Sequence, residues 1–166
     1  MLIDKKLGKT NDLFANEVDI VWLQWYETNK RILHKETVSG KKISLRFLNE
    51  NPAFETGDIL FRDDSTTIVV DILPAQAIVI KPADMLQMAS LCYEIGNKHL
   101  PLFYEAETLL VPYEATLHKY LLAAGYDISI EDRKLQKALS TTVSPHSNAT
   151  GETLFSRIMK LTTEKK

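Results

Sequence analysis

Four histidines and one cysteine are the side chains of this 166-residue chain best suited to metal binding or nucleophilic catalysis. Neutral imidazole is a good ligand for nickel, copper and zinc, and an imidazole can also activate a thiol. The chain has no glycine-rich phosphate loop, no Gly-x-Ser-x-Gly elbow and no His-Glu-x-x-His helix. The sequence therefore gives little support to an enzyme, and each candidate residue has to be judged from its own position.

Cys92 is expected on the inner face of a helix that opens at residues 82–84 and ends with Gly96 as its C-cap. A nucleophilic role would need activation by His99 or His118, whereas a thiol on an apolar helix face is usually inert. We therefore predict a buried, structural thiol. The apolar residues that recur at helical spacing on this face are Met85, Met88, Ala89, Cys92 and Ile95.

Three histidines have ordinary explanations besides metal binding. His34 falls in a predicted strand, where a half-exposed position accounts for it. His118 follows Glu114 by one helical turn, a spacing that favours a surface ion pair over a shared metal. His146 falls in the polar run Ser-Pro-His-Ser-Asn at residues 144–148, where composition alone does not favour a ligand.

His99 stands in a different setting. It follows Gly96-Asn97-Lys98 at the end of an apolar helix, and Pro101 then starts a strand. The imidazole should therefore project from a tight corner, which suits a metal ligand, although a histidine at a helix end can also cap carbonyl groups. On these residues alone, the two roles are equally favoured.

The elements that position these residues fall into two halves, which predicts an α+β protein. The first half, residues 1–74, is expected to be β-rich, because residues 20–80 are rich in β-branched and aromatic side chains between turn signals. In the strand over residues 42–48, alternation predicts one buried face. The strands expected in this half cover residues 20–26, 31–37, 42–48, 59–61 and 68–73, with a hairpin turn at Ser39-Gly40.

From residue 75, strands alternate with helices in the order β-α-β-β-α-β, which predicts a ferredoxin-like domain over residues 75–138. Its second helix, residues 114–124, is expected to point Leu117, Tyr120, Leu121 and Ala124 inward. Residues 139–166 are predicted to form a polar tail. Each of two domains of about 70–80 residues would be only marginally stable with a core of its own. We therefore expect them to pack against each other or against a partner.

Charge and cysteine usage limit the partners and the compartment. Lys plus Arg number 20 against 22 Asp plus Glu, so the net charge of −2 offers no basic excess for nucleic acid. We expect no membrane span and no secretory signal, because no suitable apolar run follows the start of the chain. A single cysteine cannot form an intramolecular disulfide, so the sequence predicts a cytoplasmic protein.

Residues 93–99, Tyr-Glu-Ile-Gly-Asn-Lys-His, resemble the Gly-Asn-Arg-His signature of the UreE family of urease accessory metallochaperones. The likeness runs from about residue 15 to 150 and includes Gly57-Asp58-Ile59-Leu60-Phe61 and residues 143–148. The resemblance implies a peptide-binding-like N-terminal domain and a homodimer that holds nickel between two copies of the signature histidine. Carried over to this chain, the principal ligand is His99 and the auxiliary tail ligand is His146.

The resemblance also implies which proteins receive the nickel. It would pass to the urease maturation GTPase (UreG) and through it to the urease apoprotein complex, while zinc or copper can occupy the same site. Because imidazole binds metals only when neutral, affinity is expected to fall below about pH 6.

Three departures from the family pattern are visible. Lys98 replaces the usual arginine and loses its planar fork. Tyr113 and Ala115 stand where some members have further histidines, and the chain lacks a histidine-rich tail. Bulk nickel storage is therefore not expected.

Two other hypotheses stay open beside a dimeric nickel carrier. In the first, the protein is an assembly chaperone whose β-rich domain binds peptides and whose metal is incidental or structural zinc. Nothing in residues 20–74 contradicts it. In the second, a thiol enzyme uses Cys92, and this hypothesis predicts that the native protein is alkylated.

Overall fold

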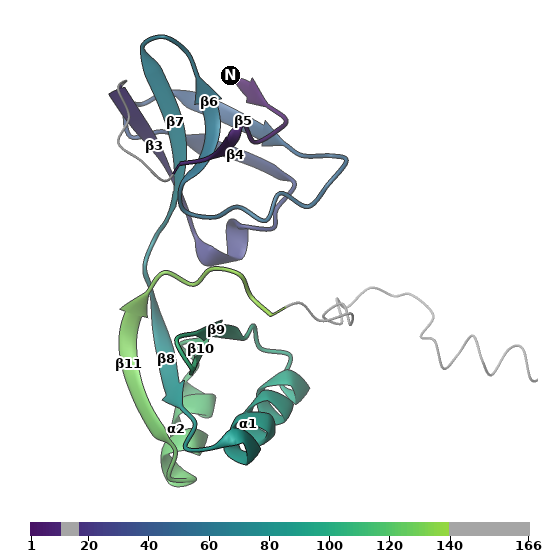
Figure 1. Ribbon diagram of the computed structural model, residues 1–166, viewed down its shortest axis with the longest axis vertical. Coiled ribbons are helices and arrows are strands. Elements are labelled where there is room, and N and C mark those ends of the chain that lie inside the picture. The colour runs from purple at the N-terminus through teal and green to yellow at the C-terminus, as the bar shows by residue number, and fades with distance from the viewer. Residues whose placement is uncertain (11–16, 140–166) are drawn as a thin grey trace, which may run out of the picture.

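The computed structural model describes residues 1–10 and 17–139, which divide into a β-sheet unit followed by a mixed unit (Figure 1). In the N-terminal unit, one sheet has three strands and the other has four. The first sheet has the order β1 (Leu2–Ile3), β5 (Lys42–Arg46), β4 (Ile32–Glu36), and the second has the order β2 (Gly8–Lys9), β6 (Asp58–Arg62), β7 (Thr66–Ile72), β3 (Glu17–Leu23).

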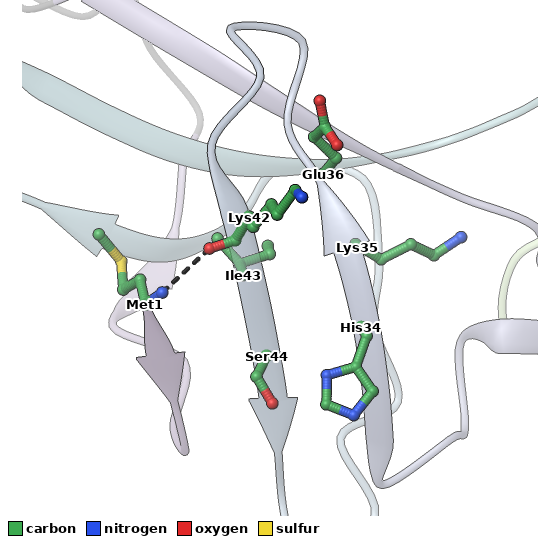
Figure 2. A pocket seen from close by; sticks show the side chains of 7 residues that line it. All are labelled: Met1, His34, Lys35, Glu36, Lys42, Ile43 and Ser44. Carbon is green, nitrogen blue, oxygen red and sulfur yellow. Dashed lines mark hydrogen bonds between the residues drawn. The ribbon is translucent and has the colours of Figure 1, made fainter.

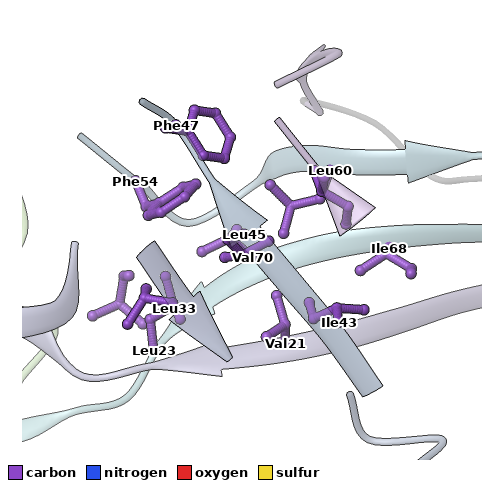
Figure 3. Close-up of a cluster of buried hydrophobic side chains, with 12 residues drawn as sticks. Val21, Leu23, Leu33, Ile43, Leu45, Phe47, Phe54, Leu60, Ile68 and Val70 are labelled. Carbon is purple, nitrogen blue, oxygen red and sulfur yellow. The ribbon is translucent and has the colours of Figure 1, made fainter. Parts of the chain in front are cut away.

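The core of the N-terminal unit lies between these two sheets (Figure 3). The alternation in residues 42–48 correctly predicted its buried face, since Ile43, Leu45 and Phe47 are 3%, 0% and 1% exposed. The Phe47 ring meets the Phe54 ring edge to face, with centroids 5.1 Å apart. Opposite them, β3 and β7 bury their own apolar side chains in the same cluster.

The Ser39-Gly40 turn joins β4 to β5 as predicted, and Gly40 takes a φ of +86° that favours glycine. The Asp19 carboxylate holds this turn by accepting hydrogen bonds from the Ser39 N–H at 3.0 Å and the Ser39 hydroxyl at 2.6 Å. Burial raises the pKa of Asp19, but the hydrogen bonds from Ser39 and Thr37 outweigh it and bring the pKa below its usual value.

The predicted strand over residues 20–26 is wrong at its C-terminal end. Strand β3 stops at Leu23, and Trp25–Glu27 form a 3₁₀ turn, η1. The cause is local, because the Glu27 side chain accepts a hydrogen bond from the Gln24 N–H at 2.9 Å and so favours a turn over a strand. The two-residue strands β1 and β2 are too short to leave an alternating pattern and were not predicted.

The C-terminal unit has the predicted ferredoxin-like arrangement. Its four-stranded sheet has the antiparallel order β11-β8-β10-β9, and both helices pack on one face through Leu91, Ile95, Leu117 and Leu121. The elements are β8 (Ala75–Lys81), α1 (Met85–Asn97), β9 (Phe103–Glu105), β10 (Thr108–Pro112), α2 (Ala115–Ala123) and β11 (Asp127–Arg133). The α+β class predicted from the sequence is confirmed.

The other face of this sheet is covered by Leu135, from the segment after β11, and by the N-terminal unit. Trp25 of η1 packs against a cluster that includes Val79, Phe103 and Leu110. Its ring meets Phe103 edge to face, with centroids 6.2 Å apart. The two small units therefore share apolar contact, as their size led us to expect.

A polar clip reinforces this contact beyond the end of β11. The Lys134 ammonium lies 2.6 Å from an Asp71 carboxylate oxygen, which also accepts a hydrogen bond from the Thr56 hydroxyl at 2.9 Å. The Thr56 N–H donates to the Gln136 side chain at 3.0 Å. The segment after β11 thus fastens the C-terminal unit to the loop before β6 and to β7.

Candidate metal centre

His99 forms the corner at the C-terminal end of α1. Its N–H donates to the Gly96 carbonyl at 3.0 Å, and the Leu100 N–H reaches the Ile95 carbonyl at 3.5 Å. This pair of bonds, with Lys98 as C-cap, is the Schellman arrangement that ends many helices. The prediction that Gly96 is the C-cap is wrong, because the helix continues through Gly96 to Asn97.

The backbone of His99 is left-handed, with φ of +55°. A Schellman turn usually places glycine here, since an L-residue with a side chain pays about 1–2 kcal/mol for this conformation. Histidine tolerates it better than most residues, and non-glycine residues in this region cluster at functional sites. The turn places His99 on the protein surface.

Lys98 links this corner to the second helix. Its ammonium lies 3.2 Å from the Glu94 carboxylate and 5.5 Å from the centre of the Tyr120 ring on α2. A cation above an aromatic face is attracted by the ring quadrupole. Lys98 therefore makes an ion pair and a ring contact, although without the planar fork that an arginine would offer.

The outer face of α1 is apolar as well as its inner face. Met85, Leu86 and Tyr93 are 81%, 77% and 73% exposed, and Ala89 lies between them on the surface. The sequence had assigned Met85 and Ala89 to the inner face, which is wrong: the fully buried positions of α1 are Leu91 and Ile95.

The segment from residue 85 to 93 contains no charged side chain. This absence is a signal that the sequence reasoning missed, because a helix with only one buried face usually carries charges on the other. Gly96 lies on the same outer face, and a Cβ added there would meet nothing within 4 Å inside the chain. The outer face of α1 is thus largely apolar over residues 85–93 and open at Gly96, and the charges nearest to His99 on this helix end are those of the Glu94–Lys98 pair.

His118 does not pair with Glu114, contrary to the prediction. The Glu114 carboxylate instead caps α2 by accepting hydrogen bonds from the N–H groups of Thr116 at 2.8 Å and Leu117 at 2.6 Å. These two bonds lower the pKa of Glu114. The half-buried His118 ring lies 5.7 Å from the Tyr113 ring, so its contact is aromatic.

The remaining candidates are spread over the chain. His34 is an exposed residue of β4 in the N-terminal unit, as the sequence predicted for a strand residue. Cys92 packs against the core of the C-terminal unit but is half-buried rather than fully buried. His146, the predicted auxiliary ligand, lies outside the described residues.

Within residues 1–10 and 17–139, no three side chains of histidine, cysteine, aspartate or glutamate gather closely enough to hold a metal ion. A site at His99 would therefore need ligands from residues 140–166, from a second copy of the chain, or from both. Imidazole is a suitable ligand for a borderline metal such as nickel. One imidazole, however, leaves most coordination positions of the ion to be filled by other ligands.

Comparison with known proteins identifies the family. The N-terminal domain of the UreE urease accessory protein family matches residues 3–73, and its C-terminal domain matches residues 75–151. The chain belongs to this family, as its Gly-Asn-Lys-His segment had suggested. The family supports a role in the maturation of urease, and its members are accessory proteins rather than urease itself.

Individual relatives cover nearly the whole chain. The urease accessory protein UreE of Flavobacterium johnsoniae is 38% identical over 150 residues, which are 90% of this chain and 91% of the relative. That of Acetivibrio thermocellus is 35% identical over 90% of this chain and 98% of its own length. That of Actinobacillus pleuropneumoniae is 37% identical over 81% and 72%. In the described part of this chain, no helix is long and apolar enough to cross a membrane.

Proposed function

We propose that this protein is a nickel metallochaperone that works as a homodimer and supplies nickel for assembly of the urease metallocentre. The His99 imidazoles of two copies would hold the ion between them, with His146 as an auxiliary ligand. The nickel would pass to the urease maturation GTPase (UreG) and then to the urease apoprotein complex. Zinc or copper would compete for the same ligands, because complexes of divalent first-row metals are most stable for copper.

The observation that carries this proposal is the position of His99. It occupies a left-handed turn that favours glycine, and it lies at the end of the apolar outer face of α1. Glycine would make this turn more stable, so an imidazole in its place supports a role as ligand, although Ala53, Ala106, Glu107 and Lys137 also have positive φ.

The outer face of α1 supports the proposal that two copies of the chain associate. An exposed apolar surface of this kind marks an interaction site, and a two-fold axis brings the same surface of two subunits together. Because residues 85–93 carry no charge, two copies of this part of α1 would not repel each other. Such an arrangement places the two His99 residues near one axis and supplies the ligands that one chain lacks.

The release of nickel is compatible with this site. Closed sites with four protein ligands serve structural metals, whereas an exposed site with few protein ligands keeps positions open for exchange. His99 is exposed, so a partner's ligands can reach the ion. A carrier requires this access because it must give up its cargo.

Calorimetric titration of the full-length protein with nickel tests the proposal. We expect about one tightly bound ion per two chains. Replacement His99→Asn, which tolerates the left-handed turn but removes the imidazole, should abolish tight binding. Unchanged affinity in this variant would show that His99 is not the ligand.

The zinc and peptide hypothesis is tested in cells that depend on urease activation. If His99→Asn activates urease as well as the unsubstituted protein does, the metal is incidental and the chaperone acts through its N-terminal unit. Loss of activation in a variant that keeps its fold and its dimer supports nickel delivery.

A further inference from the structure

The outer face of the three-stranded sheet in the N-terminal unit carries an open pocket of about 590 Å³ (Figure 2). His34 and Glu36 of β4, Lys42 and Ser44 of β5, and Met1 contribute to its lining. The pocket lies in a different unit from His99. It is therefore separate from the candidate metal centre.

Strand register arranges the outward side chains of this face in rows. Ile43 and Leu45 point into the core, so their neighbours along β5 point outward. Direct cross-strand neighbours share a face and contact one another. The rows are Leu2–Ser44–His34, Arg46–Ile32 and Lys42–Glu36.

Two aliphatic side chains on this face are exposed to solvent. Leu2 is 63% exposed and Ile32 is 53% exposed, on strands that flank β5 from either side. Neither side chain lines the pocket itself, but the two lie on either side of the β5 residues that do, so one occupant of the pocket could contact both. An occupant with apolar side chains would remove both from water.

Ser44, on the strand between them, needs a hydrogen-bonding group from any occupant. Its hydroxyl oxygen is shielded from solvent and has no hydrogen-bond partner in the described part of the chain. A shielded hydroxyl without a partner is unfavourable. His34, its exposed cross-strand neighbour, can rotate away and let a polar group of an occupant reach it (Figure 2).

The charges on this face favour an anionic occupant. Neither Lys42 nor Arg46 makes an ion pair with another described residue, whereas Lys35 is already paired with Glu27 at 2.5 Å. Glu36 is the one carboxylate in the three rows and lies opposite Lys42, so Arg46 is the cation of these rows that has no facing carboxylate. Complementary charge around an apolar centre gives both attraction and selectivity.

We propose that this face docks an acidic segment of a partner protein. Apolar side chains of the segment cover Leu2 and Ile32, and its carboxylates pair with Lys42 and Arg46. Polar groups of the segment give the Ser44 hydroxyl a partner. Docking is independent of nickel, because the face belongs to the N-terminal unit and contains none of the proposed metal ligands.

Fluorescence anisotropy of the full-length protein tests docking with two short labelled peptides. In one, leucine alternates with glutamate, and in the other, leucine alternates with lysine. We expect the acidic peptide to bind at least about tenfold more tightly, a difference of ~1.4 kcal/mol, and its affinity to fall as salt is raised.

Substitutions locate the binding. Ile32→Gln and Arg46→Gln should each weaken the acidic peptide about tenfold. Leu122→Gln on α2 is the matched control, since Leu122 is 55% exposed and lies on the other unit. Circular dichroism and urea unfolding establish that each variant is folded, and nickel titration should be the same for all of them.

Three results would overturn the proposal: equal binding of the two peptides, unchanged binding by folded Ile32→Gln, or equal weakening by Leu122→Gln. A fourth concerns the occupant. If Ile32→Gln reduces self-association of the free protein in sedimentation, the face contacts a second copy of this chain instead. Because nickel titration is measured on the same variants, failure of docking is distinguishable from failure of the nickel site.

Discussion

The N–H of His99 donates to the carbonyl of Gly96 at 3.0 Å, so the proposed metal ligand is also the residue that turns the chain out of α1. Its φ of +55° means that this turn is made at the expense of backbone strain. Two substitutions separate the ligand from the turn, because glycine removes both the strain and the imidazole, whereas alanine removes only the imidazole.

We expect His99→Gly to raise the free energy of unfolding of the metal-free protein by about 1 kcal/mol while abolishing tight nickel binding. His99→Ala is the matched control, since it lacks the imidazole and keeps the strain. It should lose nickel equally and be less stable than His99→Gly. Urea unfolding and calorimetric titration measure the two effects, and tight nickel binding by His99→Gly would contradict the assignment of the ligand.

The apolar outer face of α1 gives a prediction for the dimer. Ala89 lies on this face among Met85, Leu86 and Tyr93, and near a two-fold axis each residue meets a copy of the same surface. Ala89→Glu therefore introduces two carboxylates into one interface. We expect the dimer to weaken roughly hundredfold, which is ~2.7 kcal/mol, and nickel binding to fall with it.

Ala123→Glu serves as the control for this substitution, because Ala123 is an exposed alanine at the end of the other helix. Sedimentation velocity over a range of concentrations measures the monomer–dimer equilibrium of both variants. Unaltered association of Ala89→Glu would mean that two copies do not meet through this face of α1.

The pKa of Asp71 determines how the stability contributed by the polar clip should depend on pH. Burial raises the pKa of Asp71, but hydrogen bonds from Lys134, Thr56 and the Ile72 N–H outweigh it, so the pKa lies below its usual value. A carboxylate with a lowered pKa in the folded state stabilises the protein above the unfolded value, about 3.9. This contribution is lost as the pH falls through the folded pKa.

Asp71→Asn should therefore reduce the free energy of unfolding by about 1–2 kcal/mol at neutral pH. The difference from the unsubstituted protein should shrink as the pH falls below about 4. Urea unfolding at several pH values checks this, with Asp132→Asn on β11 as a control at an exposed carboxylate. A difference that is independent of pH would contradict the role assigned to the Asp71 charge.

How far the sequence predicts this structure depends on how local the determining interactions are. The buried face of Ile43, Leu45 and Phe47 and the order of the ferredoxin-like elements follow from alternation and turn signals along the chain. The end of β3 is also set locally, by the hydrogen bonds between Gln24 and Glu27, but the apolar and aromatic run through residue 26 carries no glycine, proline or other turn signal that marks it.

Helix α1 illustrates the same limit at the candidate site. Apolar residues occupy both of its faces, so periodicity alone could not decide whether Met85 or Leu91 points inward. That choice is made by contacts with distant strands. The position of His99 was predictable from the Gly-Asn-Lys-His segment, whereas its left-handed backbone depends on which residue ends the helix.

The contact between Trp25 and Phe103 predicts how strongly the two units depend on each other. Trp25 is half-buried, so Trp25→Ala should reduce the free energy of unfolding by about 2 kcal/mol, below the usual range for a fully buried tryptophan. Because Trp25 packs against the sheet face opposite the helices, its loss should also let the units unfold separately, with two heat-absorption peaks in scanning calorimetry.

Trp22→Ala is the matched control, because Trp22 is 36% exposed on β3 and belongs to none of the described core clusters. This variant should keep the coupling between the units. Phe103→Leu tests the other side of the contact and should have a smaller effect than Trp25→Ala, since it keeps an apolar side chain under the indole. If Trp25→Ala and Trp22→Ala behave alike, the polar clip of Asp71, Lys134 and Gln136 holds the units together without the aromatic contact.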